Sequence, residues 1–375
     1  MKTVSTDEFK KAIALANCIK SKSAAIFDYV LLDGDGQNIK ILKTNGRLSC
    51  RLQVESEFEG QMCINAERLL KLLQAADADR IGLEAEMDGD KPRLAVFDGD
   101  VKYSLTTMTR DEFPDLNFSG DGDYVATANA NELRTAVKEC EAFSAKDDAR
   151  SYLNGVWCRA AGEGRAEFDV FATDGHRMLV HPIPAAYDKA FYFFIEGDQI
   201  KPFLRFFGKN ATVVITGSSG LTTISSEDGN EVVTLRNPDF EPPPVDEVIP
   251  DEESMFELKV SPEDLLKLAK KAMKIEGRSK VNVLITIEAT RENVLFTLGR
   301  SESGSRMEAK VEGFFDSPKS IKMHFNCQFV IDAMSLFLGE GTRIFTGRPE
   351  HDGRLKRPFL IKNGKRLAIV MPIYL

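Results

Sequence analysis

The chain of 375 residues lacks several features that would place it in a specialised class of protein. No apolar run approaches the ~20 residues that a helix needs to cross a bilayer, so the sequence predicts no membrane partner. The first residues do not form the apolar core of a signal peptide, and we expect a cytoplasmic protein. No phosphate-binding loop of the pattern G-x-x-x-x-G-K-[ST] is present. The sequence therefore predicts a chain that holds no cofactor and does not hydrolyse nucleotides itself.

Cysteine and histidine are both sparse and scattered. No two cysteines form a close pair such as C-x-x-C, and they stand at Cys18, Cys50, Cys63, Cys140, Cys158 and Cys327. This usage predicts free thiols in a reducing compartment and excludes a disulfide framework. The four histidines, His176, His181, His324 and His351, do not have the spacing of metal ligands. We therefore expect no metal site.

Basic residues are outnumbered by acidic ones. Lys and Arg total 49 against 58 Asp and Glu, which gives a formal net charge of −9. A net negative charge by itself disfavours nucleic acid as a partner. The acidic residues, however, gather in turns and in the segment 241–253, whereas the basic residues gather on predicted helices. The distribution of charge therefore keeps nucleic acid open as a partner.

What the chain does contain is a threefold repeat. Amphipathic segments opened by a capping residue begin at Ser5, Asn129 and Ser261, which are 124 and 132 residues apart. A second set of segments begins at Asn65, Glu196 and Asn326, which are 131 and 130 residues apart. Two independent anchors with nearly the same period predict three similar domains. We place them at 1–120, 121–250 and 251–375.

Each third has the predicted order helix, strands, helix, strands. Short strand runs are separated by turn strings that supply the positive φ angles of tight hairpins: Asp33-Gly-Asp-Gly, Asn45-Gly, Asp88-Gly, Asp98-Gly, Asp228-Gly and Asn363-Gly. Many hairpins with few helices predict an α+β fold with antiparallel sheets. The proline and acid run 241–253 predicts a stiff, extended linker before the last domain.

Basic residues recur on the faces of the predicted helices. Lys267, Lys270, Lys271 and Lys274 have i, i+3, i+4, i+7 spacing and share one helical face. Such a face is either simply solvated or binds phosphates by charge, independently of base sequence. We expect contact with double-stranded DNA, and the candidate DNA-facing residues are Lys10, Lys20, Lys22, Arg68, Lys71, Arg134, Lys138, Lys146, Lys201, Arg205, Lys267, Lys271 and Lys274.

Two local strings admit other interpretations. Asp174 and His176, with Ser151 upstream, suggest a hydrolase triad. No G-x-S-x-G string occurs, and Asp174 is too close in sequence to orient His176, so a hairpin at Asp174-Gly175 is favoured. The string that begins at Asp33 resembles a calcium loop but has Asn38 and Thr44 where glycine and glutamate are required. We therefore predict a turn there.

Four strings resemble the bacterial sliding clamps, the β subunits of replicative DNA polymerase III. They are Arg150-Ser-Tyr-Leu-Asn-Gly-Val, Ala172-Thr-Asp-Gly-His-Arg-Met, Phe325-Asn326 at the start of a predicted helix, and the final Val-Met-Pro-Ile-Tyr-Leu. With the threefold repeat, the resemblance covers the whole chain. It implies a head-to-tail homodimeric ring of six similar domains, with helices lining the hole and sheets outside. Such a ring encircles duplex DNA, catalyses nothing, and confers processivity by tethering the replicative polymerase after a clamp loader has opened it.

The resemblance also implies two interaction sites. A pocket for the peptides of polymerase and other clamp-binding-motif proteins would lie between the second and third domains, with walls made by Arg150, Tyr152, Leu153, Thr173, Gly175, His176, Arg177, Met178, Asn326, Phe329, Val370, Met371, Pro372 and Ile373. The dimer interface would join the first domain to the third domain of the other subunit, at Tyr103, Leu105, Met273 and Ile275. The alternative is a ring-shaped, DNA-bound scaffold that recruits repair factors, as a diverged or phage-borne clamp.

Overall fold

The computed structural model describes residues 2–21, 23–118, 122–160, 162, 166–208, 211–218, 220–276, 283–298, 304–347 and 358–373. The chain divides into two compact units. Unit 1 contains Met1–Thr135, Arg159–Phe168 and Pro184–Asp239, and unit 2 contains Ala136–Cys158, Asp169–Ile183 and Phe240–Leu375. The middle third of the sequence thus contributes to both units, and the three domain boundaries drawn above stay a prediction.

Helices begin at all six of the predicted positions. They are α1 (Thr6–Ala16), α2 (Ala66–Ala75), α3 (Ala130–Glu141), α4 (Gly197–Phe203), α5 (Pro262–Glu276) and α6 (Cys327–Leu336). The Asn65 side chain accepts from the amide of Arg68 at 3.0 Å, and that of Asn326 accepts from the amide of Gln328 at 2.9 Å. These bonds satisfy amides that the first helical turn leaves free. None of the helices in the described ranges has both the length and the apolarity to span a bilayer.

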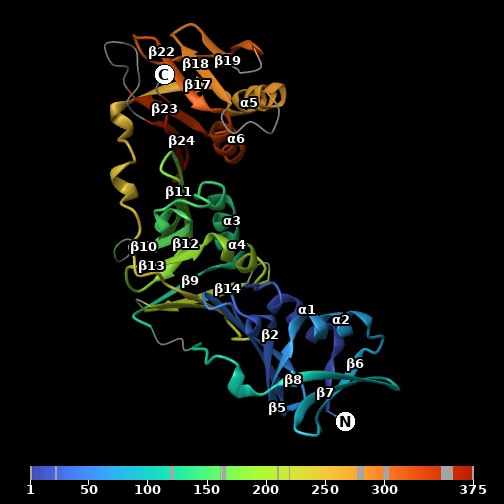
Figure 1. The fold of residues 1–375 in the computed structure, drawn as a ribbon. Helices are drawn as coiled ribbons and strands as arrows, with labels where there is room; N and C mark the ends of the chain where they lie inside the picture. Colours follow the sequence, from blue (N-terminus) through green and yellow to red (C-terminus); the bar gives the residue numbers. More distant parts are fainter. Residues whose placement is uncertain are drawn as a thin grey trace. The chain divides into compact units, whose positions relative to one another are not determined.

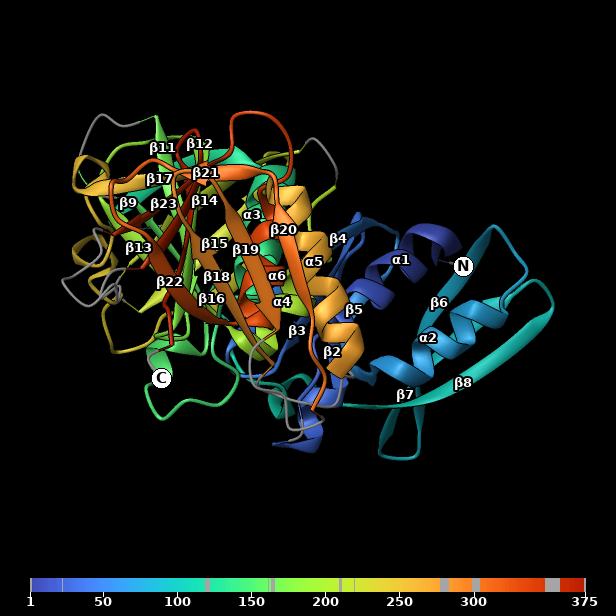
Figure 2. The ribbon, with the colours of Figure 1, turned by 90° about the horizontal axis from the view of Figure 1, so that it is seen from above.

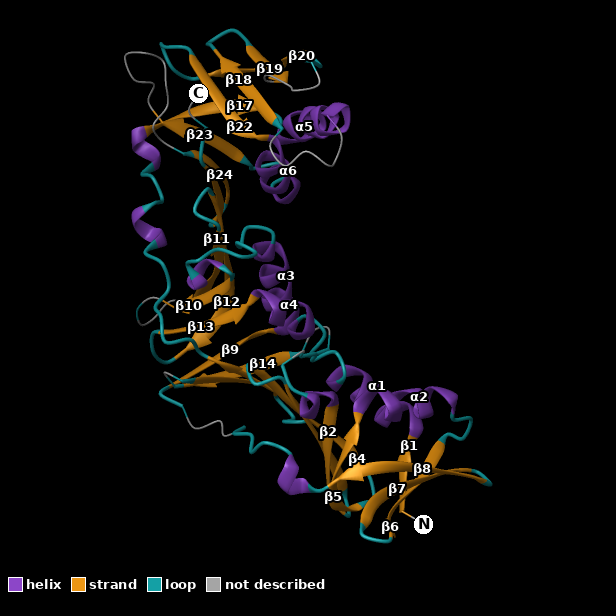
Figure 3. Cartoon of the chain, in the orientation of Figure 1, coloured by secondary structure: helices purple, strands orange, loops and turns teal. Residues whose placement is uncertain are grey.

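The strands pair in antiparallel fashion, as predicted. The first third has β1 (Lys2–Ser5), β2 (Tyr29–Asp35), β3 (Asn38–Thr44), β4 (Leu48–Glu55), β5 (Glu59–Asn65), β6 (Arg80–Asp88), β7 (Lys91–Asp98) and β8 (Val101–Met108). The middle third has β9 (Tyr124–Asn129), β10 (Gly155–Ala160), β11 (Glu167–Thr173), β12 (Arg177–Tyr187), β13 (Phe191–Glu196), β14 (Thr212–Gly217), β15 (Leu221–Ser226) and β16 (Glu231–Arg236). The last third has β17 (Met255–Val260), β18 (Leu284–Ala289), β19 (Val294–Leu298), β20 (Glu308–Val311), β21 (Gly313–Phe315), β22 (Ile321–Asn326), β23 (Arg343–Gly347), β24 (Phe359–Asn363) and β25 (Arg366–Val370). The α+β fold class is therefore confirmed (Figure 3).

The predicted turn strings connect successive strands. The glycines that end the six strings have φ between 58° and 89°, which a residue with a Cβ adopts only under strain. In the calcium-like string, Asp35 Oδ1 accepts from the amides of Gln37 at 3.0 Å and Asn38 at 2.8 Å. The carboxylate therefore closes a hairpin turn, as the sequence predicted.

Two pairs of helices each lie within a single unit. In unit 1, α1 and α2 lie side by side, and Phe9, Ile13 and Leu69 on their inner faces are fully buried (Figures 1 and 2). In unit 2, α5 packs against α6, where Cys327 Sγ donates to the carbonyl of Ala269 at 3.2 Å, and Ala269 and Val330 are fully buried. Each fully buried aliphatic or aromatic side chain of this size stabilises the fold by about 2 kcal/mol. This burial fixes which helical faces remain exposed.

One strand pairing between successive thirds is made twice. In unit 1, β4 of the first third pairs with β16 of the middle third, with Leu48 opposite Leu235. In unit 2, β12 of the middle third pairs with β25 of the last third, with Arg177 opposite Val370. The strands β16 and β25 are each the last of their third, so the two pairings are equivalent. We call the β4–β16 pairing the first joint and the β12–β25 pairing the second joint.

Candidate functional site

The string Thr173–Arg177 folds as a tight turn between β11 and β12 at the second joint. The Thr173 hydroxyl accepts from the amide of Gly175 at 3.1 Å, and Asp174 Oδ1 accepts from the amides of His176 at 2.9 Å and Arg177 at 3.0 Å. Gly175 has a φ of +85°, and a Cβ at this residue would lie 3.2 Å from Nη2 of Arg150. The turn therefore requires glycine for its backbone and for the approach of Arg150.

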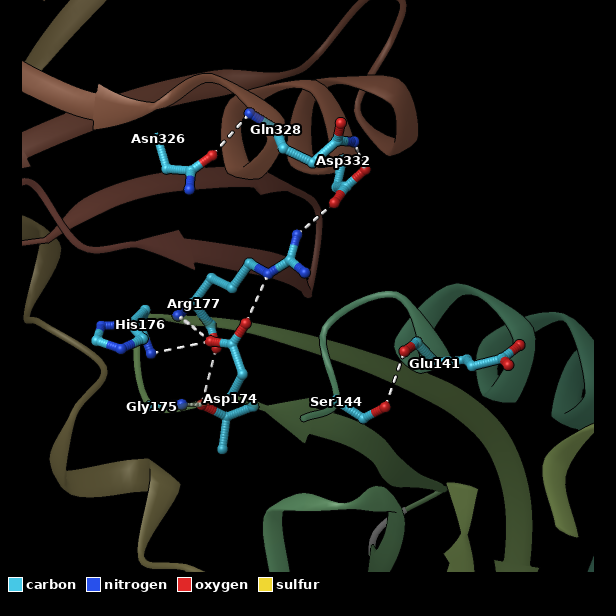
Figure 4. A network of polar contacts seen from close by, with 10 residues as sticks. Glu141, Ser144, Asp174, Gly175, His176, Arg177, Asn326, Gln328 and Asp332 are labelled. Carbon is cyan, nitrogen blue, oxygen red and sulfur yellow. Dashed lines mark hydrogen bonds and ion pairs between the residues drawn. The ribbon is translucent and has the colours of Figure 1, made fainter. Parts of the chain in front are cut away.

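Arg177 is a nearly buried cation held between two thirds of the sequence. Its Nε donates to Asp174 Oδ2 at 2.9 Å, and its Nη1 forms an ion pair with Asp332 of α6 (Figure 4). Its guanidinium also lies over the rings of Phe329, 4.4 Å from the centroid, and Phe143, at 5.3 Å. Only 11% of the side chain is exposed. Because both of its ionic partners are carboxylates, the charge of Arg177 is fully neutralised within the protein.

The last described residues complete an apolar surface beside this network. The amide of Met371 donates to the carbonyl of His176 at 2.8 Å, and the amide of Ile373 donates to the carbonyl of His324 at 2.7 Å. The His176 ring stacks against Phe329, with centroids 6.4 Å apart. Val370 is buried, while Ile373 is 39% exposed. The final segment is thus tied by backbone hydrogen bonds to both the middle and the last third.

A loop from the middle third forms the other wall. Arg150 Nε and Nη2 each donate to one oxygen of Asp148 at 3.0 Å. These bonds hold the pKa of the Asp148 carboxyl at about 2, below its ordinary 3.8. The Tyr152 carbonyl accepts from Trp157 Nε1 at 2.8 Å, and the Tyr152 ring meets that of Phe240 edge-on at 6.5 Å. The wall is therefore fixed by contacts on both sides of Tyr152.

These contacts connect residues that the sequence predicted as walls of one site. We call Arg150, Tyr152, His176, Phe329, Met371 and Ile373 the junction surface, because they are at least partly exposed around the second joint. Leu153, Met178, Asn326, Val370 and Pro372 are buried and support it from within. Thr173, Gly175 and Arg177 set the turn. That partner peptides bind here stays a prediction.

Four residues that position the junction surface were missed by the sequence reasoning. Asp148 fixes Arg150, Asp332 and Phe143 hold Arg177, and Phe240 packs on Tyr152. The pairing of Arg177 with Asp332 spans 155 residues, and nothing in the local pattern marks it. Asp148, in contrast, lies two residues before Arg150. An acid and an arginine at that spacing in a loop are a local signal for an ion pair, which we call the Asp148–Arg150 clip.

The positions of Asp174 and His176 do not support the hydrolase interpretation. Asp174 receives hydrogen bonds from the Arg177 guanidinium and from two backbone amides, so its carboxylate does not orient the His176 ring. Among the described residues, no group of His, Cys, Asp and Glu side chains is placed to hold a metal ion. All six cysteines have free thiols.

The candidate DNA-facing residues mostly lie exposed on or just after helices. Lys20, Arg68, Lys71, Lys138, Lys146, Lys201, Arg205, Lys267, Lys271 and Lys274 are exposed. Lys10 is half-buried and pairs with Asp7 at 2.8 Å. Arg134 is also half-buried, and its Nη1 donates to the carbonyl of Phe207 at 3.0 Å, so part of this side chain packs inside unit 1. Lys22 lies outside the described residues.

The four predicted interface residues lie on two elements. Tyr103 and Leu105 alternate with exposed residues on β8, and both are half-buried. Met273 and Ile275 lie in the last turn of α5, where Ile275 is 48% exposed. Whether they meet in an assembly stays a prediction.

Comparison with known proteins identifies relatives of one kind. The chain is 24% identical over 163 residues to the β sliding clamp of Caulobacter vibrioides, and this match covers 43% of each chain. It is 29% identical over 103 residues to the β sliding clamp of Escherichia coli, covering 28% of this chain and 27% of that one. The chain thus matches less than half the length of these curated relatives. No protein-family profile matches it.

Solved structures match over the full length. The DNA polymerase III subunit β of Pseudomonas aeruginosa superposes with a TM-score of 0.85 at 18% identity, covering 100% of both chains. The sliding clamp of Bacillus subtilis gives a TM-score of 0.86 at 14% identity, covering 100% of this chain and 99% of the other. The chain therefore has the sliding-clamp fold, and the resemblance seen in the sequence is confirmed.

Proposed function

We propose that this chain is a DNA sliding clamp, which encircles duplex DNA as a closed ring and tethers the replicative polymerase and other replication or repair proteins. It acts in the cytoplasm, catalyses no reaction, and depends on a separate loader to open the ring. The fold and the relatives support the class of protein. The strand pairings described above support the ring.

The observation that carries the proposal is the repeated joint. Twice within the chain, the third strand after a first helix pairs with the last strand of the next third, as β4 with β16 and β12 with β25. By the same rule, the third strand after the first helix of the last third and the last strand of the first third have no partner of this kind within the chain's described residues. Within the described residues, β20 pairs only with β19, and the Val101–Thr106 part of β8 pairs only with β7. A third copy of the joint would therefore join β20 of one chain to β8 of the next.

A joint that repeats head to tail closes into a ring when the rotation per unit allows it. Two chains of three predicted domains each supply the six domains of the expected homodimer. The residues Tyr103 and Leu105 lie on the free stretch of β8, which agrees with their expected place at the interface. The proposed contact is thus the same antiparallel pairing that the chain already makes twice within itself.

Ring closure also explains how an acidic chain works on DNA. A clamp that held DNA by direct phosphate binding tight enough for retention would resist sliding. Topological closure removes this conflict, since each exposed Lys or Arg on a helix needs only a weak, exchangeable contact. The helices that carry Arg68, Lys201 and Lys271 would then face the DNA, while the acidic residues keep other surfaces from binding it.

The assembly is tested first by mass in solution. We expect twice the 41.7 kDa of one chain by analytical ultracentrifugation. Leu105→Lys places a charge on the half-buried side of β8 and should produce monomers, whereas Thr106→Lys on the exposed side should stay dimeric. A wild-type monomer at micromolar concentration would contradict the proposed assembly.

Topology is tested on DNA. The protein is loaded by a clamp loader onto a nicked circular plasmid, and the circle is then cut with a restriction enzyme. We expect retention on the circle and loss within minutes from the linear product. Equal retention on both forms would show direct binding and would overturn the ring.

A further inference from the structure

We propose that the junction surface selects partner peptides whose apolar anchors are flanked by lysine or arginine. This inference rests on the proposed function, because it names the class of peptide that the tethered proteins must carry. It comes from the charges around the surface, which are acidic once the internal ion pairs are taken into account.

The cations of the junction surface are already paired. Arg150 is held by both oxygens of Asp148 at 3.0 Å. Arg177 has two carboxylate partners, Asp174 and Asp332, so this cluster carries one negative charge in excess. Gln328, which donates to Asp332 at 2.7 Å, is neutral. A peptide therefore meets no uncompensated arginine among these groups.

The linker adds further acids on the side of Tyr152 and His176. Phe240, the residue before the linker, packs edge-on against Tyr152 at 6.5 Å and Trp157 at 5.9 Å, which fixes where the linker starts. Val245, in the short helix η4 (Val245–Glu247), is 3% exposed and fixes the next turn. Figure 4 shows this part of the chain passing on the His176 side of the polar network.

The acids of this segment point to solvent. Glu241, Asp246 and Glu247 are all exposed, and within the described ranges neither Glu241 nor Glu247 forms an ion pair. Three successive prolines, Pro242 to Pro244, separate them and restrict the backbone, so these carboxylates keep a fixed spacing. Two anchors and a stiff backbone thus hold unpaired negative charge beside an apolar surface.

Charge of this kind acts on peptides through complementarity. Apolar anchors supply most of the affinity of a short peptide, and flanking charges discriminate among peptides that share the anchors. Because the Debye length is about 8 Å at physiological ionic strength, the acids act only on residues next to the anchors. We therefore expect a preference that depends on salt and that is limited to the flanks of the motif.

The experiment uses the full-length dimer and two fluorescein-labelled synthetic peptides. Both have the same apolar centre, taken from a polymerase tail peptide, and one carries lysines on both sides where the other carries glutamates. We expect the lysine-flanked peptide to bind about tenfold more tightly at low salt. The difference should shrink toward twofold at about 0.5 M NaCl, where screening is nearly complete.

Charge reversal tests whether the linker carboxylates cause the preference for the lysine-flanked peptide. The double variant Glu241→Lys with Glu247→Lys should invert the ranking of the two peptides. The matched control, Asp251→Lys with Glu253→Lys, changes the same charge on the same linker beyond Pro250 and should leave the ranking unchanged. Equal affinity for the two peptides, or tighter binding of the glutamate peptide by wild type, would overturn the inference. Failure of the proposed function is distinguishable, since it appears as loss of ring retention on circular DNA.

Discussion

The first and second joints have the same backbone and display different chemistry. At the first joint the amide of Asn45 donates to the carbonyl of Leu48 at 3.2 Å, and at the second the amide of Asp174 donates to that of Arg177 at 3.3 Å. The amide of Arg236 bonds to the Arg47 carbonyl at 2.9 Å, just as that of Met371 bonds to His176 at 2.8 Å. The hydrogen bonds therefore align Leu48 with Arg177 and Arg47 with His176.

The side chains at these aligned positions differ in polarity. Counted from the residue before each helix, Gln199 of α4 corresponds to Phe329 of α6. Asn45 Nδ2 donates to Gln199 Oε1 at 2.7 Å, and Arg47 forms an ion pair with Glu196. Polar groups thus satisfy one another across the first joint.

At the second joint, apolar side chains are partly exposed instead. Phe329 stacks with His176, and Met371 takes the position of Arg236. The comparison shows that the strand pairing builds the joint, while a few turn and helix residues decide whether the joint offers a docking surface. An interface duplicated within one chain can be kept for structure at one place and used for binding at the other.

The largest expected effect comes from exchanging the aligned residues. Leu48→Arg places at the fully buried Leu48 a cation that the first joint cannot pair, because Asn45 stands in place of Asp174 and Pro202 in place of Asp332. An uncompensated buried charge should cost about 4 kcal/mol of unfolding free energy. Urea denaturation followed by circular dichroism measures this loss.

The controls for this exchange use both joints. Leu48→Met conserves volume and should cost less than about 1.5 kcal/mol. The converse change, Arg177→Leu, leaves two carboxylates without their cation and should cost about 2 kcal/mol. If Leu48→Arg proves as stable as Leu48→Met, the two joints do not differ in polarity as described.

The sequence revealed the shared part of the joints better than the part that differs. Caps at Asn65 and Asn326 and the glycines of the turns are local signals, because each acts on residues within one helical turn or hairpin. The pairing of β12 with β25 and the ion pair of Arg177 with Asp332 join distant parts of the chain. No local pattern specifies such contacts, so only the family resemblance placed these residues at one site.

Removing the final segment should separate docking from assembly. A chain that ends at Val370 keeps β25 but loses Met371 and Ile373, with their hydrogen bonds to His176 and His324. We expect affinity for a polymerase tail peptide to fall at least a hundredfold, which is about 2.7 kcal/mol. Arg236→Ala, the aligned position at the first joint, should leave peptide affinity unchanged. Fluorescence anisotropy reads the affinity and sedimentation confirms the dimer; unchanged affinity of the truncated chain would refute the assignment.

A buried lysine at the first joint should make stability depend on alkaline pH. Lys43 precedes Thr44 as Ala172 precedes Thr173, and it is fully buried with Nζ donating to the Phe27 carbonyl at 2.5 Å. Burial lowers the pKa of Lys43 from 10.5 to about 8. Between these values the unfolded chain binds a proton that the folded chain does not, so the free energy of unfolding should rise with pH by about 3 kcal/mol.

The measurement is the difference between wild type and Lys43→Met at each pH. Burial raises the pKa of Cys50, and it raises that of Cys18 to about 11, so deprotonation of the unfolded thiols above pH 9 acts in the opposite direction. Both proteins share these thiols, and the difference isolates the lysine. A difference that stays flat from pH 8 to 10.5 would show that Lys43 is not held uncharged by the first joint.

The smallest effect concerns the exposed clip that orients Arg150 at the second joint. Bonds from Arg150 lower the pKa of Asp148 to about 2, so the unfolded carboxyl, with an ordinary value of 3.8, takes up its proton first as pH falls. The stabilisation is therefore complete above pH 3.8 and is lost as pH falls toward 2.

NMR titration of the Asp148 side-chain carbon should give a midpoint near 2 in wild type and near 3.8 in Arg150→Ala. Since the clip is solvent-exposed, its contribution to global stability should be too small to detect, and peptide affinity below pH 3 should respond before unfolding does. A wild-type midpoint near 3.8 would mean that Arg150 is free in solution, and the wall of the junction surface would then form only when a peptide binds.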